Sequence, residues 1–141
     1  MRAELEAPTP QTVEYLPVFV YGTLKPTAQR SNHNFTLIEH AITGQQPGSI
    51  SGYDMFSTGM FPYVVPGDGT IQGEIITLDE RRYAGVMRAL DVLEGHPHHY
   101  VRMEVPIETA TGETVRCWMY VAAADHDHIR QRYRHILSGV W

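Results

Sequence analysis

The chain contains very little cysteine and no long apolar run. Cys117 is its only cysteine, so no internal disulfide can form, and we expect a protein of a reducing compartment such as the cytoplasm. No apolar stretch approaches the roughly 18 residues of a membrane-spanning helix. Residues 1–10 lack the basic and apolar stretches of a secretory signal. These absences predict a protein with no membrane partner.

Basic residues are also scarce. The chain has 11 lysines and arginines against 16 acids, which gives a net charge of −5, and Lys25 is its only lysine. This balance disfavours a nucleic-acid partner. Hydrophobic residues make up 43% of the 141 residues, enough for one core, and this length is typical of one domain. We therefore expect a single domain over residues 15–141, preceded by a flexible lead-in over residues 1–14.

Nine prolines and twelve glycines predict a domain rich in turns, of the β or α+β class. The clearest helix spans Asp79 to Glu94, with Asp79 as its N-cap and Gly95 just past its end. We expect strands, a hairpin that follows the helix, and a tail that packs back on the body. The strands are 16–21, 48–56, 63–65 and 71–78, the hairpin is 101–109 and 114–122, and the tail is 125–141. The apolar positions of 35–42 fit either a short helix or a strand.

Glu94 occupies an unusual position on the predicted helix. At about 100° per residue, it falls within about 20° of Tyr83 and so inside the apolar stripe. Arg81 and Arg88 fall on the opposite, solvated side. Burial and the negative end of the helix dipole would both raise the pKa of Glu94, so that it could take and give a proton near pH 7. The alternative is a frayed last turn that leaves the carboxylate in water.

A second candidate site follows the first predicted strand. Tyr21, Gly22, Thr23 and Leu24 form a glycine-containing turn at the end of a buried strand. Backbone N–H groups in such a turn can hold a carboxylate or a developing oxyanion. An ordinary turn that ends a strand has the same sequence pattern, so both interpretations stay open here.

These two features occur together in a known family. The sequence resembles the gamma-glutamylcyclotransferase-like family, and it is most similar to the small members related to gamma-glutamylamine cyclotransferase. The matching stretches are 18–25 (VFVYGTLK), 61–65 (FPYVV), 71–75 (IQGEI), 90–95 (LDVLEG), 100–102 (YVR), 118–121 (WMYV) and 138–141 (SGVW). The Tyr-Gly-Thr-Leu loop combined with a downstream Leu-Glu-Gly is fairly specific as a pair.

The resemblance implies an α+β fold built on a small mixed β-barrel flanked by helices. It implies that Tyr21, Gly22, Thr23 and Leu24 bind a gamma-glutamyl group or 5-oxoproline and that Glu94 is the general acid/base. The implied reaction releases 5-oxoproline and a free amine from a gamma-glutamyl amine or peptide, in a monomer or weak homodimer with no cofactor or metal. The alternatives are a non-catalytic module that binds a small molecule in the same pocket, and an enzyme that processes a gamma-glutamyl group on an antibiotic intermediate or carrier. Tyr100 and Tyr120 could line the pocket or simply pack in the core.

Three further groups invite a functional interpretation. His96, His98 and His99 could suggest a metal, but their spacing is not that of a zinc enzyme, and solvated loop histidines are expected instead. Cys117 shares a strand face with apolar residues, which favours a buried, inert thiol. A cluster of arginines, Arg130, Arg132 and Arg134, is typical of a solvated helix face.

Overall fold

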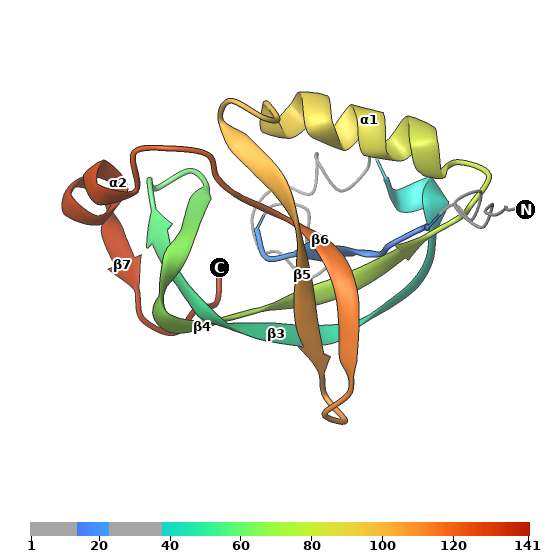
Figure 1. The fold of residues 1–141 in the computed structure, drawn as a ribbon, viewed down its shortest axis with the longest axis horizontal. Helices are drawn as coiled ribbons and strands as arrows, with labels where there is room; N and C mark the ends of the chain where they lie inside the picture. Colours follow the sequence, from blue (N-terminus) through green and yellow to red (C-terminus); the bar gives the residue numbers. More distant parts are fainter. Residues whose placement is uncertain (1–13, 23–37) are drawn as a thin grey trace, which may run out of the picture.

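The computed structural model describes residues 14–22 and 38–141 (Figure 1). The elements in chain order are β2 (Val18–Val20), the 3-10 helix η3 (Glu39–Ala41), β3 (Ile42–Ser57), β4 (Pro62–Leu78), α1 (Tyr83–Glu94), β5 (Tyr100–Thr109), β6 (Thr114–Ala122), α2 (His126–Arg132) and β7 (Arg134–Ile136). Residues 1–13 of the predicted lead-in (residues 1–14) and the start of the ambiguous 35–42 segment lie outside the described residues. No helix in the described part is long and apolar enough to span a membrane.

Five of these strands close into a barrel. The strands are hydrogen-bonded in the order β4-β2-β6-β5-β3, and β3 pairs again with β4, which completes the ring; β7 extends the sheet beyond β3. β2 is antiparallel to β4 and parallel to β6, so the barrel is mixed. In Figure 1, α1 lies along one side of the barrel, and α2 lies near the far end of the β3–β4 hairpin. The predicted α+β class, a mixed barrel flanked by helices, is confirmed.

The hairpin of β3 and β4 is longer than the sequence suggests. The strands predicted at 63–65 and 71–78 are one continuous strand, and the predicted strand 48–56 begins at Ile42 instead of Gly48. The Pro66–Gly69 segment, which lies between the two predicted strands, is part of β4, because β3 and β4 shift register between Ser51 and Tyr53 and absorb the irregularity. Gly67 and Gly69 fit there because the Asp54 carboxylate occupies the space that a Cβ atom would need.

Helix α1 buries the predicted apolar stripe. Val86, Met87 and Leu90 are buried in a core cluster with residues of the barrel strands, and Arg88 is exposed as predicted. The predicted N-cap is wrong: α1 begins at Tyr83, because the Asp79 carboxylate accepts the Arg81 N–H at 3.0 Å in a turn that precedes the helix. The stripe ends about three turns later, with Glu94 as the last helical residue.

The hairpin after the helix and the returning tail match the prediction closely. β5 and β6 pair from Tyr100 with Ala122 to Glu108 with Thr114. The tail forms α2 and β7, and the Gln72 N–H donates to the Gly139 carbonyl at 2.9 Å. The side chain of Trp141 packs against a core cluster of the barrel. The tail thus returns to the body, as its apolar end predicts.

Candidate active site

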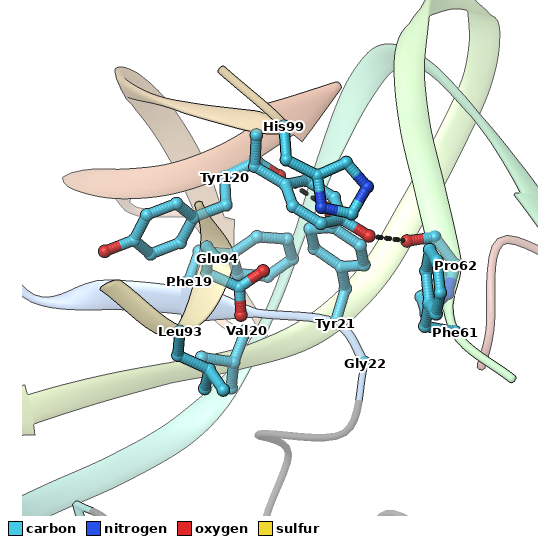
Figure 2. A pocket seen from close by; sticks show the side chains of 11 residues that line it. Phe19, Val20, Tyr21, Gly22, Phe61, Pro62, Leu93, Glu94, His99 and Tyr120 are labelled. Atoms are coloured by element: carbon cyan, nitrogen blue, oxygen red, sulfur yellow. Dashed lines mark hydrogen bonds between the residues drawn. The ribbon is translucent and has the colours of Figure 1, made fainter. Parts of the chain in front are cut away.

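A cavity of about 260 Å³ opens where the end of β2 meets the last turn of α1 (Figure 2). Its described lining residues come from β2 and the residues after it, the start of β4, the end of α1, and β5 and β6. They are Phe19, Val20, Tyr21, Gly22, Phe61, Pro62, Leu93, Glu94, His99, Tyr100 and Tyr120. The structure therefore brings Tyr21, Gly22 and Glu94 together in one pocket, and it includes Tyr100 and Tyr120. Thr23 and Leu24 lie outside the described residues, so the predicted anion-binding turn stays a prediction.

The last turn of α1 holds Glu94 over this cavity. Gly95 ends the helix in the left-handed conformation with φ of 67°, which glycine adopts without steric strain. The Gly95 N–H donates to the Val92 carbonyl at 3.2 Å, and the His96 N–H donates to the Asp91 carbonyl at 2.9 Å. Because these bonds close the final turn, the alternative of a frayed end with Glu94 in water is wrong.

Glu94 lies in apolar and aromatic surroundings. Figure 2 shows its carboxylate in the midst of the lining side chains. Burial raises the pKa of Glu94 from 4.5 to about 7. Within residues 14–22 and 38–141, Glu94 has no side-chain hydrogen bond or ion pair. A carboxyl group in this state is about equally populated as acid and base near neutral pH.

The three tyrosines around Glu94 turn their hydroxyl groups to other partners. The Tyr21 hydroxyl donates to the Tyr120 carbonyl, and the Tyr100 hydroxyl donates to the Pro62 carbonyl at 2.7 Å. The Tyr120 hydroxyl donates to the Asp91 carboxylate at 2.7 Å. Burial is the largest cause that raises the pKa of each phenol, so all three stay neutral. They therefore act toward Glu94 as apolar walls that leave its charge unpaired.

A polar network behind the cavity fixes the last turn of α1 to the barrel. Asp91, one turn before Glu94, accepts two hydrogen bonds from the Arg102 guanidinium, at 2.9 and 3.1 Å. The guanidinium also lies 4.4 Å from the ring centroid of Trp118. The Arg102 N–H donates to Nδ1 of His96 at 3.0 Å. The residues of this network lie in the motif stretches 90–95, 100–102 and 118–121. The sequence analysis identified these stretches but did not predict the contacts between them, because a motif does not show which of its side chains meet in the fold.

The histidine and cysteine alternatives have specific outcomes. His96 is held by Arg102, and His99 lines the cavity and shares a 2.7 Å hydrogen bond with the Tyr63 hydroxyl, so neither is merely a solvated loop residue. In the part of the chain that the structure describes, no three His, Cys, Asp or Glu residues gather as a metal site would require. Cys117 is buried in a core cluster, and burial raises its pKa to about 12, which makes it a poor nucleophile.

The interpretation of the arginine cluster as a solvated helix face holds in part: Arg130 and Arg132 are exposed residues of α2, whereas Arg134 lies outside the helix. Arg130 forms a 3.0 Å ion pair with the largely buried Asp54. Arg132 is exposed at the end of α2, and Arg134 belongs to β7 instead of a helix. Residues two apart share a face of a strand but point about 200° apart on a helix, so the helical interpretation did not locate the boundary between α2 and β7.

Comparison with known proteins agrees with this fold. Residues 18–141 match the family model described as gamma-glutamyl cyclotransferase, AIG2-like. The chain is 36% identical over 104 residues to the gamma-glutamylcyclotransferase family protein ytfP of Citrobacter rodentium, with coverage of 74% of this chain and 79% of the relative. It is 31% identical over 124 residues to the family protein YtfP of Escherichia coli K12, with coverage of 88% and 94%.

The solved structures support the same fold. An AIG2-like protein of Mus musculus superposes on this chain with a TM-score of 0.69 at 23% identity, and the match covers 89% of this chain and 87% of the mouse chain. At that identity the likeness concerns the fold alone. Together with the family model and the bacterial relatives, it confirms the prediction of a gamma-glutamylcyclotransferase-like enzyme: the chain belongs to the gamma-glutamyl cyclotransferase, AIG2-like family.

Proposed function

We propose that this protein, as a single domain over residues 15–141, converts a gamma-glutamyl amine into 5-oxoproline and a free amine, with Glu94 as general acid/base. One observation carries this proposal: Glu94 faces a cavity large enough for a small molecule, without a partner among the described residues, and burial raises its pKa to about 7. A carboxyl group with a pKa near the working pH transfers protons most effectively in both directions. Family membership supports the same reaction class.

The reaction needs a proton carrier more than it needs a nucleophile from the protein. The α-amino nitrogen of the substrate attacks its own γ-carbonyl carbon, and because the two are already tethered, proximity supplies much of the rate. The Glu94 carboxylate takes a proton from the attacking nitrogen. The resulting carboxylic acid gives that proton to the departing nitrogen as the old C–N bond breaks. The lactam and the amine together contain every atom of the substrate, so no water or cofactor enters.

The remaining pocket residues assist by shape and by exclusion of water. The neutral rings of Tyr21, Tyr100 and Tyr120 surround the carboxylate, which keeps its pKa high and its proton exchange directed at the substrate. The turn that begins at Tyr21 and Gly22 is the candidate for holding the substrate carboxylate or the carbonyl oxygen as its negative charge develops.

The test is to replace Glu94 with glutamine, which keeps the size and removes proton transfer. We expect kcat for release of 5-oxoproline, measured by chromatography, to fall by about 10²- to 10⁴-fold. The variant should still bind 5-oxoproline, as measured by calorimetry. Glu80→Gln, an exposed glutamate just before α1, is the matched control and leaves kcat unchanged. Full activity in Glu94→Gln would show that another group transfers the proton. A wild-type protein that binds 5-oxoproline but turns over no gamma-glutamyl amide would be the non-catalytic binding module.

A further inference from the structure

The cavity has a buried floor and a more exposed mouth. Most of the lining residues are nearly inaccessible, among them Phe19, Tyr100 and Tyr120. Five lining residues are less buried: Leu93 is 37% exposed, His99 is exposed, and Gly22, Phe61 and Glu94 are half-buried. Figure 2 shows Phe61 and Leu93 on opposite sides of the Glu94 carboxylate. We call Phe61, Leu93 and His99 the mouth residues.

The mouth is the place where the amine half of a substrate must lie. In the proposed reaction the γ-carbonyl carbon lies within reach of Glu94, and the glutamyl half curls into a five-membered ring. A compact ring can form in the enclosed part of the cavity. The departing amine, which varies in size and must leave, can extend only toward the exposed end, and there it contacts the mouth residues.

The mouth residues form a carbon-rich and preorganised surface. The His99 ring meets the Phe61 ring edge-on at 5.9 Å and 89°, and it meets the Tyr63 ring at 5.4 Å and 84°. The hydrogen bond between Tyr63 and Nε2 of His99, 2.7 Å long, fixes the imidazole in this orientation. Side chains held in place by neighbouring rings lose little freedom when a ligand binds.

The charges of the lining residues also favour an apolar amine over a charged one. Among the described residues that line the cavity, Glu94 is the only one with a carboxylate, and none is a lysine or arginine. Against these described lining residues, an amine that carried its own carboxylate, such as an amino acid, would lose water without gaining a cation. An apolar or aromatic amine would instead bury its carbon atoms against Phe61 and Leu93.

We propose, on the basis of the proposed function, that the mouth residues are a subsite for the leaving amine and select apolar, preferably aromatic, amines. The probes are three amides of the glutamate γ-carboxyl group: the benzylamide, the methylamide and the glycine conjugate. We expect wild-type kcat/KM for the benzylamide to exceed the other two by at least ten-fold, the size of effect that one apolar group of this kind produces in a hydrophobic pocket.

Variants then assign the preference to the mouth. Phe61→Ala is expected to lower kcat/KM for the benzylamide at least ten-fold more than for the methylamide, and Leu93→Ala at least three-fold more. The methylamide rate reports whether each variant is folded. Met60→Ala is the matched control, because Met60 is 76% exposed beside Phe61 and does not line the cavity; its ratio of the two rates equals that of wild type.

The outcomes separate the subsite from the reaction. Equal losses on both amides in both variants, or a wild-type preference for the glycine conjugate, would overturn the subsite while the reaction stands. If no amide is turned over, the proposed function fails, and the Kd values of the same three compounds are compared by calorimetry. Tighter binding of the benzylamide that Phe61→Ala abolishes would still support the subsite, and equal Kd values would overturn it.

Discussion

Two acids of this protein are largely withdrawn from water, and they differ in whether hydrogen bonds and ion pairs compensate the negative charge. Asp54 in β3 is only 8% exposed, and its carboxylate accepts the Gly69 N–H at 2.9 Å and pairs with Arg130 at 3.0 Å. His135 approaches it as well, at 3.8 Å. Glu94 in α1 lies among aromatic rings with no such partner in the described residues, and burial raises its pKa to about 7.

The difference separates an acid that stabilises the fold from an acid that is available for chemistry. Asp54 joins the last part of β3 to β4 through the Gly69 N–H and to α2 through its ion pair with Arg130. Glu94 receives no such stabilisation, so its buried charge reduces stability at high pH and keeps its proton exchangeable. Partner count, more than depth of burial, distinguishes the two sites.

The largest expected stability effect is at Asp54. Asp54→Ala leaves the Gly69 N–H and Arg130 without their acceptor, which we expect to lower the free energy of unfolding by about 3 kcal/mol in urea titrations. Because Asp54 lies outside the Glu94 cavity, kcat per folded molecule stays within about two-fold of wild type. Asp68→Ala, at an exposed neighbouring aspartate, is the control with little effect on either quantity. A loss of turnover in Asp54→Ala without a loss of stability would break the comparison.

Removal of the Glu94 charge should have the opposite effect on stability: Glu94→Gln is expected to be more stable than wild type at high pH, whereas Asp54→Ala is less stable. The pKa of Glu94 is raised from 4.5 in an ordinary setting to about 7, so the folded protein binds the proton more tightly than the unfolded chain. The stability that this gives is fully present below pH 4.5 and is lost as the pH rises through 7. Between pH 5 and 8, wild type is therefore expected to lose about 2 to 3 kcal/mol relative to Glu94→Gln.

This pH effect is measured as urea unfolding of both proteins at pH 5, 6, 7 and 8. Glu80→Gln, which removes an exposed acid, should follow the wild-type curve at every pH. Parallel curves for wild type and Glu94→Gln would mean that Glu94 ionises as freely in the folded protein as in the unfolded chain. Its assignment as a partnerless acid would then be wrong.

The smallest effect is expected at the polar network behind the cavity, where Asp91 holds the last turn of α1 to the barrel. Tyr120→Phe keeps the ring at the cavity and removes the hydroxyl bond to Asp91, which we expect to reduce stability by about 1 kcal/mol. Because the last turn of α1 becomes less firmly held, kcat should fall a few-fold while the pH midpoint of kcat/KM stays near 7. Tyr53→Phe, outside the Glu94 cavity, is the control. A shifted midpoint would mean that Tyr120 acts on the proton of Glu94 directly.

Residue patterns within single elements predicted much of this architecture. The period of the apolar residues from Tyr83 to Leu90 placed Glu94 toward the barrel, and strict alternation located β6 to the residue. The start of α1 was mispredicted because Asp79 has the same preference for an N-cap and for the turn it actually forms. Local preference does not choose between two structures that satisfy the same side chain.

Interactions between distant residues could not be predicted. Asp54 and Arg130 are far apart in the sequence, and neither residue type indicates its partner. The same holds for Asp91 with Tyr120, and for the rings of Phe61 and His99 that meet at the cavity mouth. The family resemblance indicated which stretches matter, whereas their contacts follow only from closure of the barrel.

The short strand β2 has a consequence for how the molecule assembles. Val18 pairs with Ile76 on one side and with Trp118 on the other, so the ring closes between segments that the ribosome makes a hundred residues apart. Such closure is slow, because a long stretch of chain must be ordered before the contact is made. The side of the cavity formed by Phe19 to Gly22 is therefore completed only after β6 has been synthesised, so a nascent protein cannot form this cavity piece by piece.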